Sequence, residues 1–441
     1  MRTSFTYQPT DLNLFKAKLL AWSQTFTEVL WLDSNAESNP ESGAYSSFEA
    51  VLAVGAFTSI KTNWAQAFSQ LQDYQKACSD WIFGYLSYDL KNDTEALSSH
   101  NFDALEFPDL YFFQPKKLFF IKDNQVSVQY LNAFSAEWET DLNAIQAISL
   151  QEINTKQASG LSIKARIPKA AYLTKVNQVL NHIYRGDIYE ANFCQEFYAN
   201  NATINPLQTY NKLNSISKPP FAAFLKMADK YALCASPERY LKKYGNTVVS
   251  QPIKGTAKRS KDKETDLALK QTLATDAKER SENIMIVDLV RNDLSKTAVK
   301  GSVTVSELCK VYAFKQVHQM ISTITSRVPK NTCPSNVIKT TFPMGSMTGA
   351  PKISAMRIIE ATEETKRGLY SGAIGYISPQ GDFDFNVVIR SILYNHSKKY
   401  VSFSVGSAIT AKSTAEKEYN ECLLKAKAMR QVLEQPNNAD T

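Results

Sequence analysis

The chain has 441 residues, 44% of them apolar and 21% charged, which is typical of a soluble globular protein and excludes disorder over most of its length. Its net charge of +7 is spread over 50 basic and 43 acidic residues, so no basic block indicates a nucleic-acid surface. Six cysteines form no CxxC pair, and no secretion signal or membrane-spanning run is recognisable, so we expect a cytoplasmic protein with reduced thiols and no membrane or nucleic-acid partner.

The first third of the chain is aromatic and rich in predicted strands. A polar, turn-rich stretch at 151–164 (QEINTKQASGLSIK) separates it from a longer remainder that mixes strands and helices. We therefore predict two parts, an N-terminal region over residues 1–155 and a catalytic domain over residues 160–437.

The segment QPIKGT at 251–256 carries Lys254 where a predicted strand ends in a loop. A lysine becomes a nucleophile when burial or a neighbouring cation depresses its pKa. From the residues alone, a surface lysine beside a glycine remains the alternative.

Two stretches, 265–290 and 414–433, have apolar residues at helical spacing. Each carries a pair of glutamates three residues apart, on one helix face: Glu279 and Glu282 in the first, Glu418 and Glu421 in the second. If these faces meet, they form an all-oxygen site without Cys or His, which suits Mg²⁺. Solvated helix faces are the alternative.

The loop 344–352 (MGSMTGAPK) places glycines before a predicted helix at 351–364. Such a loop lets backbone N–H groups approach an anion at the helix N-terminus. The GxxxxGK[ST] spacing is absent, so ATP binding is not indicated. A plain turn into the helix is the alternative.

The C-terminal third contains three consecutive predicted strands, 373–378, 382–394 and 399–405, joined by short turns. Such connections imply antiparallel sheet. Arg390 is a charge inside the second strand and calls for a carboxylate partner, whereas His318 is by default a hydrogen-bonded structural histidine. The predicted fold is α+β, with large antiparallel β-sheets packed as a sandwich and helices outside.

Eight segments, in chain order, closely resemble the motifs of the chorismate-utilising enzymes, which include anthranilate synthase component I and the isochorismate and salicylate synthases. They are GDIY (186–189), ASPER (235–239), PIKGT (252–256), ENIMIVDLVRND (282–293), GSMTGAPK (345–352), YSGAIGY (370–376), VIRS (388–391) and EYNE (418–421). WIFGYLSYDL (81–90) and FPDL (107–110) match more loosely. The resemblance implies the fold of anthranilate synthase component I, with residues 160–437 as its chorismate-binding domain.

Position 254 separates the chemistries within this family. Anthranilate and isochorismate synthases resemble one another in carrying Ala there, whereas Lys254 is similar to the subgroup that aminates chorismate at C4 for p-aminobenzoate and folate biosynthesis. The resemblance implies that the lysine attacks C2 while the C4 hydroxyl leaves, and that ammonia then adds at C4 to give 4-amino-4-deoxychorismate. An anthranilate synthase component I and a non-catalytic chorismate-binding homologue remain the alternatives.

The resemblance also implies a role for each candidate residue. As Mg²⁺ ligands it implies Glu282 and Glu421, with Glu279 and Glu418 as an outer, water-mediated pair. As catalytic residues it implies Lys254, Glu238 as the general acid, and His318. As substrate-binding residues it implies Gly255, Thr256, Ser346, Tyr370, Arg390, Gly406 and Lys425.

Some positions depart from the family pattern. Ala408 replaces the second glycine of a pair that begins at Gly406, and Glu190 stands near the position where isochorismate synthases carry a water-activating lysine. The segment LWLDS (30–34) lacks the tryptophan-feedback motif, so feedback inhibition by tryptophan is not expected. No Gly-x-Cys-x-Gly elbow is found, so ammonia is expected from a separate glutaminase subunit.

Overall fold

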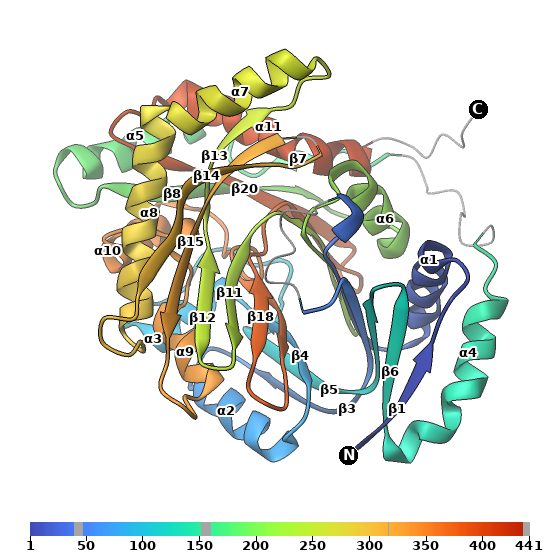
Figure 1. Ribbon diagram of the computed structural model, residues 1–441. Coiled ribbons are helices and arrows are strands. Elements are labelled where there is room, and N and C mark those ends of the chain that lie inside the picture. The colour runs from blue at the N-terminus through green and yellow to red at the C-terminus, as the bar shows by residue number, and fades with distance from the viewer. Residues whose placement is uncertain (39–46, 151–159, 316, 435–441) are drawn as a thin grey trace.

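The computed structural model describes residues 1–38, 47–150, 160–315 and 317–434. Its eleven α-helices among these residues are α1 (Leu12–Trp22), α2 (Ala67–Cys78), α3 (Lys91–Thr94), α4 (Trp138–Ala147), α5 (Lys169–Tyr184), α6 (Pro206–Ser217), α7 (Lys263–Thr275), α8 (Ala277–Ser295), α9 (Pro334–Thr341), α10 (Lys352–Thr362) and α11 (Ala415–Glu434). In Figure 1 these helices surround a central body of strands, with α8 along one side and α1 and α4 at the other.

Twenty strands lie within the described residues. The first ten are β1 (Arg2–Tyr7), β2 (Glu28–Asp33), β3 (Ala50–Thr62), β4 (Ile82–Leu86), β5 (Leu110–Lys122), β6 (Gln125–Leu131), β7 (Lys164–Ala165), β8 (Glu190–Ala199), β9 (Phe221–Met227) and β10 (Lys230–Ser236). The others are β11 (Arg239–Tyr244), β12 (Thr247–Gln251), β13 (Ile253–Lys258), β14 (Thr304–Ala313), β15 (Val317–Arg327), β16 (Gly349–Ala350), β17 (Ala373–Ile377), β18 (Phe383–Asn386), β19 (Ser391–Asn395) and β20 (Tyr400–Thr410).

These strands form one connected sheet system whose named strand pairs are all antiparallel. Antiparallel pairing needs only short connections, and the sequence provides them. The predicted α+β class with antiparallel sheet and outer helices is therefore confirmed.

Strands from the N-terminal third pair directly with strands from the rest of the chain. β2 pairs with β9, from Glu28 opposite Met227 to Asp33 opposite Ala222, and β4 pairs with β17. The predicted boundary near residue 155 falls in 151–159, outside the described residues. The two predicted parts, one on each side of this boundary, contribute strands to the same sheet.

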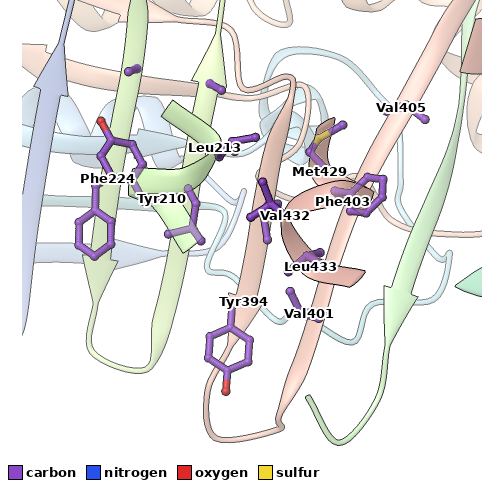
Figure 2. Close-up of a cluster of buried hydrophobic side chains, with 14 of the residues drawn as sticks. Tyr210, Leu213, Phe224, Tyr394, Val401, Phe403, Val405, Met429, Val432 and Leu433 are labelled. Carbon is purple, nitrogen blue, oxygen red and sulfur yellow. The ribbon is translucent and has the colours of Figure 1, made fainter. Parts of the chain in front are cut away.

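A large apolar core holds α6 and α11 against the sheet. Figure 2 shows this packing through Tyr210 and Leu213 of α6, Met429, Val432 and Leu433 of α11, and the strand residues Phe224, Tyr394, Val401, Phe403 and Val405. On α11 the buried residues recur every three or four positions, from Glu418 through Cys422 to Leu433, so the helix presents one stripe to the sheet. The packing of this stripe fixes the orientation of the glutamates at the helix start.

The predicted helix over 265–290 is instead two helices, α7 and α8, with a break at Asp276. The backbone of Asp276 is extended, and its carboxylate accepts hydrogen bonds from the N–H groups of Lys278 and Glu279 at 2.9 Å each. Aspartate is a strong N-cap because its side chain satisfies N–H groups that have no partner within the helix. The prediction of one helix was wrong because apolar periodicity alone did not register this cap.

The predicted strand over 382–394 is interrupted between β18 and β19. Arg390 there adopts a φ of 53°, a left-handed conformation that ends regular strand pairing. The neighbouring hairpins, β17 with β18 and β19 with β20, are present as predicted.

Within the described residues no helix is long and apolar enough to cross a membrane, and the six cysteines are free.

Candidate active site

Lys254 lies on β13 at an irregularity of the sheet. The register against β15 shifts between Ile253 and Thr256, and Gly255 has a φ of +99°, which a residue with a side chain rarely adopts. A bulge of this kind re-aims the side chain beside it. Nζ of Lys254 donates a hydrogen bond of 2.9 Å to Oε1 of Glu190, whose side chain is 1% exposed.

Carboxylates dominate the surroundings of Lys254. Burial acts to lower its pKa, but Glu190, and more weakly Glu282 and Glu238, outweigh burial and raise the pKa above the ordinary lysine value. A nucleophilic lysine is usually produced by a depressed pKa. The resting side chain here is instead an ammonium ion held in an ion pair.

Glu238 differs from Lys254 in that burial raises its pKa instead of lowering it. It lies between β10 and β11, buried at 4% exposure, and burial raises its pKa to about 7, against the opposing effects of a hydrogen bond with the Ser346 side chain and the charge of Lys254. Near neutral pH a large share of this carboxyl is therefore protonated. A buried acid with a pKa near the working pH is suited to proton donation.

The four glutamates of the predicted metal site lie on α8 and α11, and electrostatic coupling links the two helices through Lys278 and Glu279. Burial raises the pKa of Glu279, and Asp276 and Glu421 add to that effect, whereas Lys278 opposes it. Burial likewise raises the pKa of Glu282. For Glu421 burial is outweighed by the neighbouring Lys425, whose Nζ lies 2.7 Å from its Oε1, and the pKa falls.

These glutamates interact electrostatically but do not form a closed cage. Across the residues that the structure describes, no three His, Cys, Asp or Glu side chains lie at metal-binding spacing. The ammonium of Lys278 acts on all four glutamates and lies 3.7 Å from Oε1 of Glu282. Glu418 is buried at 4% exposure.

A cavity of about 110 Å³ opens beside β13 and β15. Its apolar lining includes Met429 of the core stripe on α11, and its polar lining is formed by Ser217, Lys218, Thr256, Gln319, Arg390 and Lys425. Because three cationic side chains line one small cavity, the cavity is suited to an anion such as a carboxylate.

Arg390 reaches this cavity from the break between β18 and β19. Burial lowers the pKa of its guanidinium, although Tyr370 and Glu421 act in the other direction. No carboxylate among the described residues forms an ion pair with it. Lys425 is anchored by a 2.9 Å hydrogen bond to the backbone oxygen of Gly406. A half-buried guanidinium without an ion-pair partner is a ready site for an incoming carboxylate.

Two predicted site residues, Tyr370 and His318, do not line this cavity. Tyr370 is 3% exposed, with its hydroxyl 3.5 Å from Sγ of Cys194. His318 points away from the cavity, because Nε2 lies 3.0 Å from Asp266 of α7 while the flanking Val317 and Gln319 line the cavity. The structure therefore does not bring His318 together with Lys254 and Glu238.

Two residues of the site were not proposed from the sequence. Glu190 contacts the predicted nucleophile, and Gln319 lines the cavity with its buried Oε1 lacking a hydrogen-bond partner among the described residues. The signal for Gln319 was strand alternation on β15, which sends neighbouring side chains to opposite faces. For Glu190 the signal was its position directly after GDIY, in a segment that otherwise follows the family pattern.

The chorismate binding enzyme family matches residues 27–431 of this chain. The chain belongs to that family. "Aminodeoxychorismate synthase component 1" of Salmonella typhimurium is 38% identical over 62% of this chain and 59% of the relative. "Anthranilate synthase component I-like protein" of Synechocystis sp. is 34% identical over 80% of this chain and 72% of the relative. The crystal structure of anthranilate synthase component I from Streptococcus pneumoniae superposes with a TM-score of 0.77 at 26% identity, covering 86% of this chain and 91% of that one.

Proposed function

We propose that this enzyme aminates chorismate at C4 to give 4-amino-4-deoxychorismate, with Lys254 as a covalent nucleophile at C2. The observation that carries the proposal is the half-buried Lys254, in contact with one carboxylate and electrostatically coupled to a second carboxyl, Glu238, whose pKa of about 7 leaves much of it protonated near neutral pH. The name of the Salmonella relative supports the same reaction.

The proposed reaction has two displacement steps. The amine of Lys254 bonds to C2 of the ring, both conjugated ring double bonds shift by one position toward C4, and the C4 hydroxyl leaves as water with the proton of Glu238. Ammonia then bonds to C4, both double bonds shift back, and the C2–N bond to Lys254 breaks. The product ammonium returns a proton to Glu238.

Carboxylate recognition is assigned to the cavity. Arg390 and Lys425 pair with a carboxylate of the substrate, and Thr256 and Gln319 offer neutral hydrogen-bond partners beside it. These contacts hold the ring in one orientation relative to the nucleophile, which lowers the entropic part of the barrier.

The residues of α8 and α11 fit a magnesium ion, because their donor set is carboxylate oxygen alone and burial raises the pKa of Glu279 and Glu282 in its absence. Glu282 and Glu421 would hold the ion directly, and Glu279 and Glu418 through water. When bound, Mg²⁺ supplies a positive charge that anchors the ring carboxylate of the substrate.

Ammonia in this proposal comes from a separate glutaminase subunit. The designation "component 1" of the Salmonella relative supports the existence of a second component. The free cysteines are compatible with the reducing cytosol, where p-aminobenzoate and folate biosynthesis would use the product.

The competing activity is that of an anthranilate synthase component I, which the name of the Synechocystis relative favours. Incubation with chorismate, Mg²⁺ and ammonium distinguishes the two. We expect p-aminobenzoate only after an aminodeoxychorismate lyase is added. Fluorescent anthranilate and pyruvate without the lyase would refute the proposed function.

Replacement of Lys254 by Ala tests the covalent route directly. We expect Lys254→Ala to form no mass adduct with chorismate and to lose amination, whereas Lys258→Ala, at the exposed end of the same strand, keeps both. The readouts are intact-protein mass spectrometry and the lyase-coupled assay. Unchanged amination in Lys254→Ala would show that the lysine is not the nucleophile.

A further inference from the structure

Glu190 is the carboxylate in contact with Lys254, and the proposed function has so far given it no role. Its side chain is 1% exposed. Oε1 accepts the 2.9 Å hydrogen bond from Lys254, and Oε2 is buried without a hydrogen-bond partner among the described residues. An unsatisfied buried acceptor is energetically unfavourable, and in the part of the chain that the structure describes the carboxylate keeps one oxygen without a protein partner beside the oxygen that contacts Lys254.

The position of Glu190 is fixed by backbone on both sides. It begins β8 and pairs with Ala350 of β16 and with Thr410 of β20. Gly349 has a φ of +153°, and a Cβ there would lie 2.1 Å from the Glu190 backbone oxygen. Only a glycine lets β16 approach this closely. The carboxylate is therefore held on rigid elements, as a group that must meet one nitrogen atom requires.

Lys254 needs a proton acceptor before it can react, because an ammonium ion has no free electron pair. The ionisable groups that act on it are Glu190 from β8, Glu238 from the loop after β10, Glu279 and Glu282 from α8, and Glu421 from α11. Glu238 acts as the proton donor, and the glutamates of α8 and α11 are the proposed metal site. Glu190 is the remaining group, and it is already hydrogen-bonded to the nitrogen.

We propose that Glu190 is the base that removes the proton from Lys254 and so frees its amine to attack chorismate. This inference rests on the proposed function. The N–H bond of the ammonium breaks, the proton forms an O–H bond on the Glu190 carboxylate, and the nitrogen electron pair bonds to C2. When the C2–N bond later breaks, the neutral amine takes the proton back from Glu190, and the ion pair is restored.

Adduct formation without ammonium isolates this step. Glu190→Gln is mixed rapidly with chorismate and Mg²⁺, quenched, and the mass gain of chorismate less one water is followed by intact-protein mass spectrometry. We expect the rate to fall about 100- to 10,000-fold while the chorismate dissociation constant changes little. Glu196→Gln is the control, because Glu196 is also buried on β8 but pairs with Arg166, and it should form the adduct at the parental rate.

A pH series separates proton removal from mere positioning. In Glu190→Gln the amine must lose its proton to solvent, so between about pH 5 and 7, where Glu238 still holds its proton, its adduct rate should rise about tenfold per pH unit, more steeply than in the parent. Glu190→Asp keeps a carboxylate and should lose less rate than Glu190→Gln. Equal losses in the two variants, a Glu190→Gln rate that does not change with pH over that range, or a parental rate in Glu190→Gln would each overturn the proposal. If the parent itself forms anthranilate and no adduct, the proposed function fails instead.

Discussion

Near neutral pH Lys254 and a large share of Glu238 are protonated, for different physical reasons. Neighbouring carboxylates raise the pKa of Lys254 against the effect of burial, whereas burial itself raises the pKa of Glu238 to about 7. When two ionisable groups of one site owe their pKa values to different environments, one can act as an acid and the other as a base or nucleophile. The lysine must lose its proton for the first step, and Glu238 must still hold its own.

Glu238 should give the pH–rate profile a descending limb on its alkaline side. Because its carboxyl acts as an acid with a pKa of about 7, the proton donor is lost as the pH rises through that value, and kcat/KM for chorismate should fall. Glu238→Gln should lower the rate about 100- to 10,000-fold and remove this limb. A pH–rate profile of the parent without a descending limb near neutrality would contradict the assignment.

The same carboxyl should also affect stability. Its folded pKa of about 7 lies above the ordinary value of 4.5, so its favourable contribution is complete below pH 4.5 and is lost as the pH rises through about 7. Above that pH, Glu238→Gln should be more stable than the parent by about 3 kcal/mol. Thermal unfolding at acidic and alkaline pH measures this, and a gain at acidic pH equal to that at alkaline pH would refute it.

Arg390 should determine affinity more than turnover. A charge-assisted hydrogen bond contributes about 1.5–3 kcal/mol, so Arg390→Ala should raise KM for chorismate by about 10- to 150-fold with a smaller effect on kcat. Arg390→Lys should recover only part of the loss, because an ammonium cannot present the planar fork of a guanidinium. Steady-state kinetics checks this, and an unchanged KM would exclude Arg390 from substrate binding.

At the scale of elements, the four glutamates lie within the first two turns of α8 and α11. Asp276 starts α8 three residues before Glu279, and the buried stripe of α11 begins at Glu418. Two helix starts fixed by a cap and by core packing thus bring the four glutamates near one another. The gap between them is where the proposed magnesium ion belongs.

Loss of a proposed direct Mg²⁺ ligand should raise the Mg²⁺ requirement more than loss of a water-mediated one. Glu279→Gln should raise the Mg²⁺ concentration for half-maximal activity by about 10- to 100-fold, and Glu282→Gln should raise it further. Isothermal titration with Mg²⁺ and chorismate gives a readout separate from activity. Glu264→Gln, in the first turn of α7, is the control. Equal Mg²⁺ requirements in all three variants would refute a site on these helices.

The elements could be predicted wherever local patterns decide them, and the predictions failed where the site interrupts a pattern. The hairpin strands and α11 followed from periodicity and turn residues. The cap at Asp276 and the left-handed Arg390 break such periods. The cap is local, because the Asp276 carboxylate accepts from the N–H groups of Lys278 and Glu279, and apolar spacing does not detect it. Arg390 is held by contacts distant in sequence, such as Ala235 N–H donating to its backbone oxygen. The resemblance to the family also predicted His318 as a site residue. Side chains alternate between the two faces of β15, and it is Gln319 that lines the cavity.

At the scale of the molecule, the two predicted parts depend on each other through shared strands. β2 lies against β9 and β4 against β17, so residues 160–437 alone would expose two strand edges. An exposed edge offers unpaired backbone groups to other chains.

Residues 160–437 produced alone should therefore aggregate or unfold without cooperativity. Co-expression with residues 1–155 should restore a soluble complex with lyase-coupled activity. Circular dichroism, thermal unfolding and size-exclusion chromatography measure the outcome. A cooperative unfolding transition of residues 160–437 alone, at the temperature of the intact chain, would refute this dependence.

The pairing of β4 with β17 has a consequence for the nascent chain. Leu86 is paired with Ala373, roughly 290 residues later, and a ribosome that adds about 5–20 residues per second needs about 15–60 s to make that distance. For this interval the buried strand Ile82–Leu86 has one edge without its partner. The growing polypeptide is therefore more open to aggregation at this strand edge than the completed chain, in which β17 covers the edge.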